Sequence, residues 1–248
     1  MNESIPQRRV QRVRHELVRR DLQVHAVRMI SPQLKAITLA GPALAGFVSA
    51  SFDDHLKLMI EGPDGQPVRR DYTPAHFDAE RLELTIEFAL HGHGQASEWA
   101  RHAQVGDAAT IGGPRGSMII PVDYDWHLLA GDLSALPAIT RRLRELPAST
   151  QALVLLLTDP ADARPMVSQA TLTVQHVSTP AAFLSSLQAL TLPAGEGFAW
   201  CAGEAQLMAQ ARDLLARHHR LPKEAMRVAA YWKQGTESYH DNLESAGA

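Results

Sequence analysis

The chain has 248 residues, of which 45% are hydrophobic and 21% are charged, values that are typical of a folded globular protein and exclude a disordered chain. The formal net charge of −3 gives no general attraction for nucleic acid. A single cysteine, Cys201, excludes an internal disulfide. The N-terminus carries no continuous apolar run of a secretory signal, and the longest apolar runs are too short to span a bilayer. The sequence therefore predicts a cytoplasmic protein without membrane insertion.

The N-terminal end is rich in arginine. Six arginines lie within thirteen residues and face a single acid, Glu16: Arg8, Arg9, Arg12, Arg14, Arg19 and Arg20. Such a segment could contact nucleic acid, an anionic membrane or an acidic partner. The simpler interpretation, which we favour, is a solvated lead-in to the first strand.

From residue 22 to about residue 122, the pattern predicts short strands separated by turns. Strands are expected over residues 34–39 and 55–60, with a turn at residues 62–65. Residues 81–88 alternate and place Leu82, Leu84, Ile86 and Phe88 on one face. Several short strands at this spacing, with little helix, predict a small antiparallel β-barrel.

After Tyr124, predicted strands alternate with predicted helices. Strands are expected over residues 126–130, 151–158, 171–177, 198–202 and 226–232, and helices over residues 135–146, 181–190 and 204–218. This alternation indicates an α/β doubly wound parallel sheet. We therefore expect a barrel domain over residues 1–123 and an α/β domain over residues 124–248, with the change near residues 121–125.

The first segment whose side chains could bind a cofactor is residues 70–74, which contain Arg70, Tyr72 and Thr73. A flavin-binding barrel needs a cation for the pyrophosphate, an aromatic ring for the isoalloxazine and a small donor near the reactive nitrogen N5. The period of two in a strand lets Arg70 and Tyr72 share a face. The alternative is an ordinary edge strand.

The second segment is residues 91–100, directly after the alternating strand. A helix predicted over residues 96–102 would present free backbone amides to a phosphate. His91 and His93 could instead bind a metal, but they lack a cysteine or carboxylate at suitable spacing. We therefore predict no metal site.

Two further segments follow predicted parallel strands, at the sheet edge where ligands bind. Residues 130–139 contain only one glycine, Gly131, so the strict dinucleotide fingerprint is absent. Ser134 could still cap the following helix and contact a phosphate. The other segment comprises residues 200–204 and 230–235. Taken singly, its residues Trp200, Trp232 and Cys201 are more typical of a core.

Together, these segments resemble the siderophore-interacting protein family of FAD-dependent ferric-siderophore reductases, a branch of the ferredoxin-reductase-like superfamily. The resemblance covers about residues 24–235, and its matching stretches are residues 55–58, 70–73, 91–92, 96–100, 113–117, 131–132, 135–139, 202–204 and 231–235. This chain departs from the pattern at Gln95, where the family usually has proline. It also departs at Leu133-Ser134, where the family usually has Glu-Thr.

The resemblance implies roles for individual residues. Tyr72 would lie against the flavin ring and Thr73 near N5, which makes these two the expected catalytic residues, and Arg70 would help to hold the flavin. The residues implied at the ribityl and pyrophosphate groups are His91, Gly94, Ala96 and Ser97. Those implied near the nicotinamide nucleotide are Asp132, Ser134, Ala202, Gly203 and Glu204. Trp232 completes the expected cofactor-binding set.

The resemblance also implies a reaction: reduction of Fe(III) to Fe(II) in a ferric siderophore or other ferric chelate, through FAD, with NADPH or NADH as electron donor. Ferredoxin is an alternative donor. A nicotinamide gives two electrons as hydride and ferric iron accepts one, so a flavin suits the step between them. Lys57, Arg115 and Lys233 resemble the family's basic triad and would attract an anionic chelate.

Several alternatives stay open at this point. The chain could be a flavin oxidoreductase with another acceptor, or a non-enzymatic module that binds iron chelates. A nucleic-acid-binding protein would leave the four segments unexplained. The donor is also open, because Arg164 could meet the 2′-phosphate of NADPH while Asp159 could suit NADH.

Overall fold

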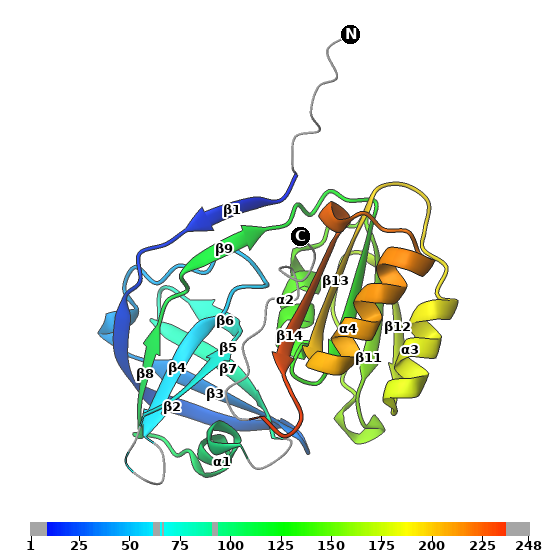
Figure 1. The fold of residues 1–248 in the computed structure, drawn as a ribbon. Helices are drawn as coiled ribbons and strands as arrows, with labels where there is room; N and C mark the ends of the chain where they lie inside the picture. Colours follow the sequence, from blue (N-terminus) through cyan, green and yellow to red (C-terminus); the bar gives the residue numbers. More distant parts are fainter. Residues whose placement is uncertain (1–8, 62–64, 66, 91–93, 237–248) are drawn as a thin grey trace.

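The structure is a computed structural model that describes residues 9–61, 65, 67–90 and 94–236. Its first half is a seven-stranded antiparallel sheet that curls on itself (Figure 1), in the order β5-β4-β8-β2-β3-β7-β6. The strands are β2 (Arg19–Ser31), β3 (Leu34–Ala40), β4 (Leu56–Glu61), β5 (Pro67–Tyr72), β6 (Pro74–Asp78), β7 (Glu83–Ala89) and β8 (Ala108–Gly112). A short 3-10 helix, η1 (Pro42–Leu44), follows β3, and α1 (Gln95–His102) lies at one end of the curled sheet.

The alternating sequence of β7 has the expected effect, because Leu84, Ile86 and Phe88 are buried in the core of the curled sheet. The strand was predicted to begin at residue 81, but it begins at Glu83, so Leu82 is not part of it. It lies before the strand with a positive φ of 53°. The residue therefore belongs to the turn, although its side chain still packs against the same core.

The second half is a five-stranded parallel sheet in the order β12-β11-β10-β13-β14. Its strands are β10 (Trp126–Asp132), β11 (Gln151–Leu157), β12 (Thr171–Val177), β13 (Gly197–Glu204) and β14 (Met226–Trp232). Its helical segments are α2 (Leu136–Glu145), η2 (Pro160–Asp162), α3 (Pro180–Ala189), α4 (Ala205–Asp213), η3 (Leu214–His218) and η4 (Lys223–Ala225).

Helices cover both faces of this sheet: α3 and α4 lie on the outer face and α2 lies on the face toward the curled sheet (Figure 1). Accordingly, every residue of the central strand β10 is buried. The predicted fold class, an antiparallel barrel-like sheet followed by an α/β parallel sheet, is confirmed. The change between the sheets falls between Ile119 and Trp126. The division into two domains near residues 121–125 stays a prediction.

The arginine-rich N-terminal end is more structured than a solvated lead-in. Residues 11–14 form β1 (Gln11–Arg14), which pairs with β9 (Gly116–Ile119). Arg9 pairs with Asp123 and Glu196, and Arg20 is buried over the ring of Phe47. These contacts correct the sequence-based interpretation for Arg9 and Arg20, whereas Arg12, Arg14 and Arg19 are exposed as expected of a solvated segment. Arg8 lies outside the described residues.

The two sheets are joined by a shared core and by polar contacts. Leu34 and Phe52 of the first half pack in one cluster with Leu129 of the second. Arg164 forms an ion pair with Glu87 at 3.0 Å. The two units therefore meet through an interface that is built as a protein interior. In the described part of the chain, no helix is long and apolar enough to cross a membrane.

Candidate functional site

A cavity of about 1120 Å³ lies between the curled sheet and the C-terminal edge of the parallel sheet. Its walls come from the end of β5, the beginning of α1 and the ends of β10, β11 and β14. The C-terminal edge of a parallel sheet is where such folds bind nucleotides. The volume is somewhat above the range of about 300–1,000 Å³ that is usual for ligand pockets.

The barrel-side wall contains the three residues predicted to hold a flavin. Arg70, Tyr72 and Thr73 all line the cavity, at the end of β5. The Tyr72 ring packs 4.4 Å from the Phe88 ring, centroid to centroid. Burial raises the pKa of Tyr72, although the charge of Arg70 opposes this shift, so the tyrosine stays protonated. Thr73 is buried, and its side chain hydrogen-bonds with Tyr231.

The N-terminus of α1 forms the next part of the wall. Gly94, Ala96 and Ser97 line the cavity, and Gly94 provides no side-chain cap for the helix. The first backbone amides of a helix lack partners within the helix and suit an anion. His91 and His93 lie outside the described residues. No group of three histidine, cysteine or carboxylate side chains that could hold a metal occurs among the residues that are described.

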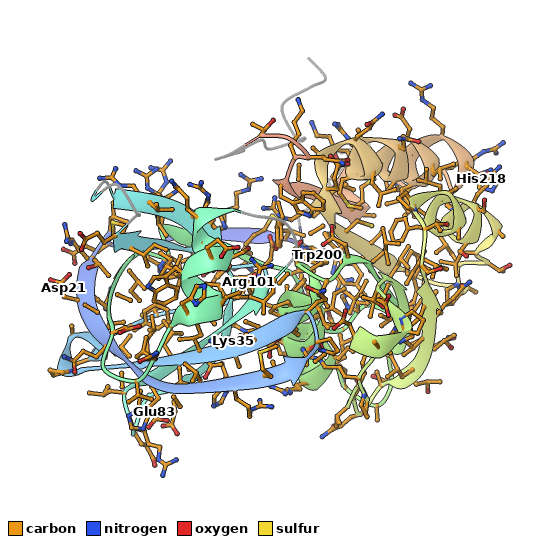
Figure 2. The ribbon with its side chains drawn as sticks, turned by 90° about the horizontal axis from the view of Figure 1, so that it is seen from below. Asp21, Lys35, Glu83, Arg101, Trp200 and His218 are labelled. Atoms are coloured by element: carbon orange, nitrogen blue, oxygen red, sulfur yellow. The ribbon has the colours of Figure 1, made fainter. Side chains whose placement is uncertain are left out.

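The opposite end of α1 is fixed by a buried lysine. Lys35 Nζ donates hydrogen bonds to the carbonyl oxygens of Arg101 at 3.0 Å and Ala103 at 3.4 Å. Figure 2 labels Lys35, a residue of β3, near Arg101 at the end of α1. A cation at the C-terminal end of a helix satisfies carbonyl groups that have no helical partner. Lys35 therefore orients the helix whose other end faces the cavity.

On the α/β side, the carboxylate of Asp132, at the end of β10, forms hydrogen bonds with the ends of β13 and β14. Its Oδ1 accepts hydrogen bonds from the backbone N and the Oγ of Ser134, at 2.9 and 2.5 Å. Its Oδ2 accepts from the Glu204 backbone N at 3.0 Å and from Trp232 Nε1 at 2.8 Å. Asp132, Ser134 and Trp232 line the cavity. Because these three side chains hydrogen-bond with each other, they hold the C-terminal edge of the sheet in place beside the cavity.

The other predicted nucleotide residues lie just behind this carboxylate. Ala202 and Gly203 are buried and do not line the cavity. A side-chain carbon on Gly203 would lie 2.6 Å from Asp132 Oδ2, which explains the glycine by close packing. Glu204 caps α4 by accepting from the Leu207 backbone N at 2.9 Å. Contact of these three residues with a nucleotide stays a prediction.

The predicted basic triad is only partly brought together. Lys233 is exposed and lines the cavity. Lys57 on β4 pairs with Asp71 at 2.9 Å, and Arg115 is exposed but lies outside the cavity lining. Their joint role in substrate binding remains a prediction.

Asp159 and Arg164, which were considered for the choice between NADH and NADPH, lie in different places. Asp159 follows β11 and lines the cavity, and its carboxylate accepts a hydrogen bond from the Ala161 backbone N at 2.8 Å. Arg164 does not line the cavity. Its guanidinium pairs with Glu87 of the first half and donates to Thr140 Oγ1 of the second half at 2.9 Å. Arg164 therefore lies at the interface between the two halves.

The sequence analysis gave no role to Asp53, Arg227 or Tyr231, which line the cavity, although Tyr231 lies in the matching stretch 231–235. Asp53 pairs with Arg227 and accepts a hydrogen bond from Trp200 Nε1 at 2.8 Å. One signal was present, since an arginine inside a predicted buried strand needs a carboxylate partner. Cys201 is buried as expected, and burial raises its pKa to about 12, which makes it unsuitable as a nucleophile.

Comparison with protein families decides the relationship. Residues 23–68 and 61–118 match the siderophore-interacting FAD-binding domain, and residues 124–235 match the siderophore-interacting protein model. The chain belongs to the siderophore-interacting protein family. Its first half is thus the family's FAD-binding domain.

Individual members of the family resemble the whole chain. It is 36% identical to the NADPH-dependent ferric-chelate reductase of Escherichia coli, over 90% of this chain and 96% of that protein. It is 29% identical to the ferric vibriobactin reductase ViuB of Vibrio cholerae, over 86% and 89% of the two chains. Among solved structures, a siderophore utilization protein from T. fusca superposes with a TM-score of 0.86 at 31% identity, over 94% of this chain and 99% of that one.

The cavity wall fits an FAD. It supplies a tyrosine ring, a buried threonine hydroxyl, an arginine and an uncapped helix N-terminus that faces the same space. These are the groups that an isoalloxazine and a pyrophosphate require.

Proposed function

We propose that this chain is an FAD-dependent ferric-chelate reductase, which uses electrons from NADPH or NADH to reduce Fe(III) in a siderophore or similar chelate. The observation that carries the proposal is the shared cavity, which has the flavin-type wall of β5 and α1 on one side. On its other side lies the C-terminal edge of the parallel sheet. An FAD and a nicotinamide could therefore meet there. The likeness to named ferric-chelate and ferric vibriobactin reductases supports the same reaction.

The residues of this chain would bind and orient the reactants. Bound FAD would supply the chemistry that takes an electron pair from a nicotinamide and gives single electrons to ferric iron. Tyr72 would cover the flavin ring, and Thr73, oriented by Tyr231, would offer its hydroxyl near N5. Arg70 and the first amides of α1 would bind the pyrophosphate.

The substrate side of the proposal rests on charge. Ferric siderophores, notably catecholates, are often strongly anionic, and a basic rim would raise their local concentration. Lys57, Arg115 and Lys233 are the proposed rim. A cytoplasmic location and ferredoxin as an alternative donor belong to the same proposal, and we predict no nucleic-acid partner.

A visible spectrum of the purified protein tests the proposal directly. We expect flavin absorption bands, loss of these bands when NADPH or NADH is added without oxygen, and their return when a ferric chelate follows. The released Fe(II) would be trapped by a ferrous-specific dye. Protein that contains no flavin and takes up none at micromolar concentration would overturn the proposal.

The same experiment separates the alternatives. A protein whose flavin is reduced by the donor but is not reoxidised by any of several ferric chelates is an oxidoreductase with another acceptor. A colourless protein that binds a ferric chelate without oxidising the donor is a binding module.

A further inference from the structure

A buried ion pair forms part of the cavity wall. Asp53 lies on the loop before β4, and Arg227 lies near the beginning of β14, so the pair joins the two halves of the protein. The Arg227 side chain is 13% exposed and that of Asp53 is 3% exposed. Both residues line the cavity. The proposed reaction has not used either of them.

The negative charge of the pair is fixed in position. Asp53 Oδ2 contacts the guanidinium of Arg227, and Asp53 Oδ1 accepts the hydrogen bond from Trp200 Nε1 at 2.8 Å. Figure 2 shows Trp200 between the two halves of the molecule. Because both carboxylate oxygens have partners, the carboxylate is held in one orientation toward its cation.

The field of this pair reaches the residue that contacts Thr73. Burial raises the pKa of Tyr231, the charge of Asp53 raises it further, and the charge of Arg227 lowers it. The Tyr231 side chain also hydrogen-bonds with Thr73. The two charges therefore act in opposite directions on the wall where the flavin is proposed to lie. The low effective dielectric constant of a buried position strengthens the interaction between these charges and nearby groups.

We propose that the Asp53–Arg227 pair sets the reduction potential of the FAD bound in this cavity. The inference rests on the proposed FAD site. Reduction by two electrons adds negative charge to the flavin ring system, so a fixed carboxylate nearby disfavours the reduced form and a fixed cation favours it. With both signs present, the potential reflects their balance. Asp53 and Arg227 are thus positioning residues that act through their field.

Two single substitutions should move the potential in opposite directions. Asp53→Asn keeps the shape of the side chain and leaves Arg227 unbalanced, so the potential should rise. Arg227→Gln leaves the carboxylate unbalanced, so the potential should fall. We expect each shift to change the ratio of the affinities for reduced and oxidised FAD at least tenfold, about 30 mV for a two-electron couple. The double variant should return close to the wild-type value.

The measurement is a redox titration of the FAD-loaded protein, with FAD affinity and thermal stability recorded beside it. The control is Glu145→Gln, which breaks contacts with Arg141 and Arg142 at the same interface but away from the cavity. It should lower stability and leave the potential unchanged. Equal potentials in both single variants and the wild type, or shifts of the same sign, would overturn the inference.

A further variant covers the case in which a single substitution prevents folding or FAD binding. Trp200→Phe keeps both charges and an aromatic ring but removes the indole N–H that donates to Asp53, so the carboxylate is less neutralised and the potential should fall. An unchanged potential in this variant contradicts the inference. A wild-type protein that binds no FAD is a separate result, which refutes the proposed function before any variant is made.

Discussion

At the scale of single residues, Asp132 explains how one part of the site tolerates sequence change. Its carboxylate accepts four hydrogen bonds, two of them from Ser134. The chain has Leu133-Ser134 where the family usually has Glu-Thr. A serine supplies the same backbone N–H and hydroxyl to Asp132 as a threonine would. The replacement of Glu-Thr by Leu133-Ser134 therefore leaves the hydrogen bonds to Asp132 intact.

Other residue contacts could not be predicted from the sequence. Asp53 and Arg227 lie in different halves of the chain, and only the folded arrangement brings them together. Composition and periodicity give the strand that contains Arg227, but they do not give the partner of its side chain. By contrast, Tyr72 and Thr73 could be singled out because their chemistry and spacing are local.

His127 should make the stability of the protein sensitive to acid. It is fully buried, and burial, together with the charge of Arg142, lowers its pKa to about 3. The unfolded chain, with a histidine pKa near 6.5, binds the proton more readily. The free energy of unfolding should therefore fall as the pH drops from about 6.5 toward 3, by up to about 1.4 kcal/mol per pH unit from this residue.

Urea unfolding at several pH values between 4.5 and 7.5 checks this expectation. His127→Gln should show a shallower loss of stability on acidification than the wild type. His102→Gln is the matched control, because the His102 side chain is 83% exposed. Parallel pH dependences in the wild type and His127→Gln would refute the assignment.

At the scale of elements, local patterns predicted the bounds of several strands and helices closely. The bounds of β12 and β14 agree with the predicted strands at both ends, and α1 begins one residue earlier than predicted. Two strands, β1 and β6, were not predicted. β1 consists of exposed residues with no alternation of burial, and β6 begins at Pro74, a residue that usually indicates a turn. Their formation depends on pairing with β9 and β7.

The orientation of α1 should depend on Lys35, a residue remote from the cavity end of that helix. Lys35→Met removes both hydrogen bonds to the C-terminal carbonyls of α1. Since such bonds contribute about 0.5–1.5 kcal/mol each, we expect the dissociation constant for FAD to rise roughly threefold to tenfold. Isothermal titration of the flavin-free protein with FAD measures this. His102→Ala, on the same helix, should have no effect, and an equal loss in both variants would argue against the mechanism.

At the scale of the whole molecule, the two halves are bound by contacts of the kind found inside one domain. Their shared core includes Leu34 and Leu129. Arg141 donates to Ser49 Oγ at 2.7 Å, and Asp162 accepts from Ser31 Oγ at 2.6 Å. The sequence gives two structural classes in succession, but it does not show that they share an interior. For that reason the change from antiparallel to parallel sheet could be predicted from the sequence, while the interface between the two sheets could not.

The shared interior predicts that both halves unfold together. Far-UV circular dichroism and tryptophan fluorescence should give one coincident urea transition, because Trp99 reports on the first half while Trp126 and Trp200 report on the second. Arg141→Met should shift this transition to lower urea without splitting it. Two separate transitions in the wild type would show that the halves are energetically independent.

The burial of the only cysteine has a practical consequence. Cys201 lies in the central part of the parallel sheet with a pKa raised to about 12, so a thiol reagent can reach and react with it only when that sheet opens. The chain thus carries a natural reporter of opening. The rate of modification by such a reagent, compared with and without FAD, would show how strongly the cofactor slows opening of the parallel sheet.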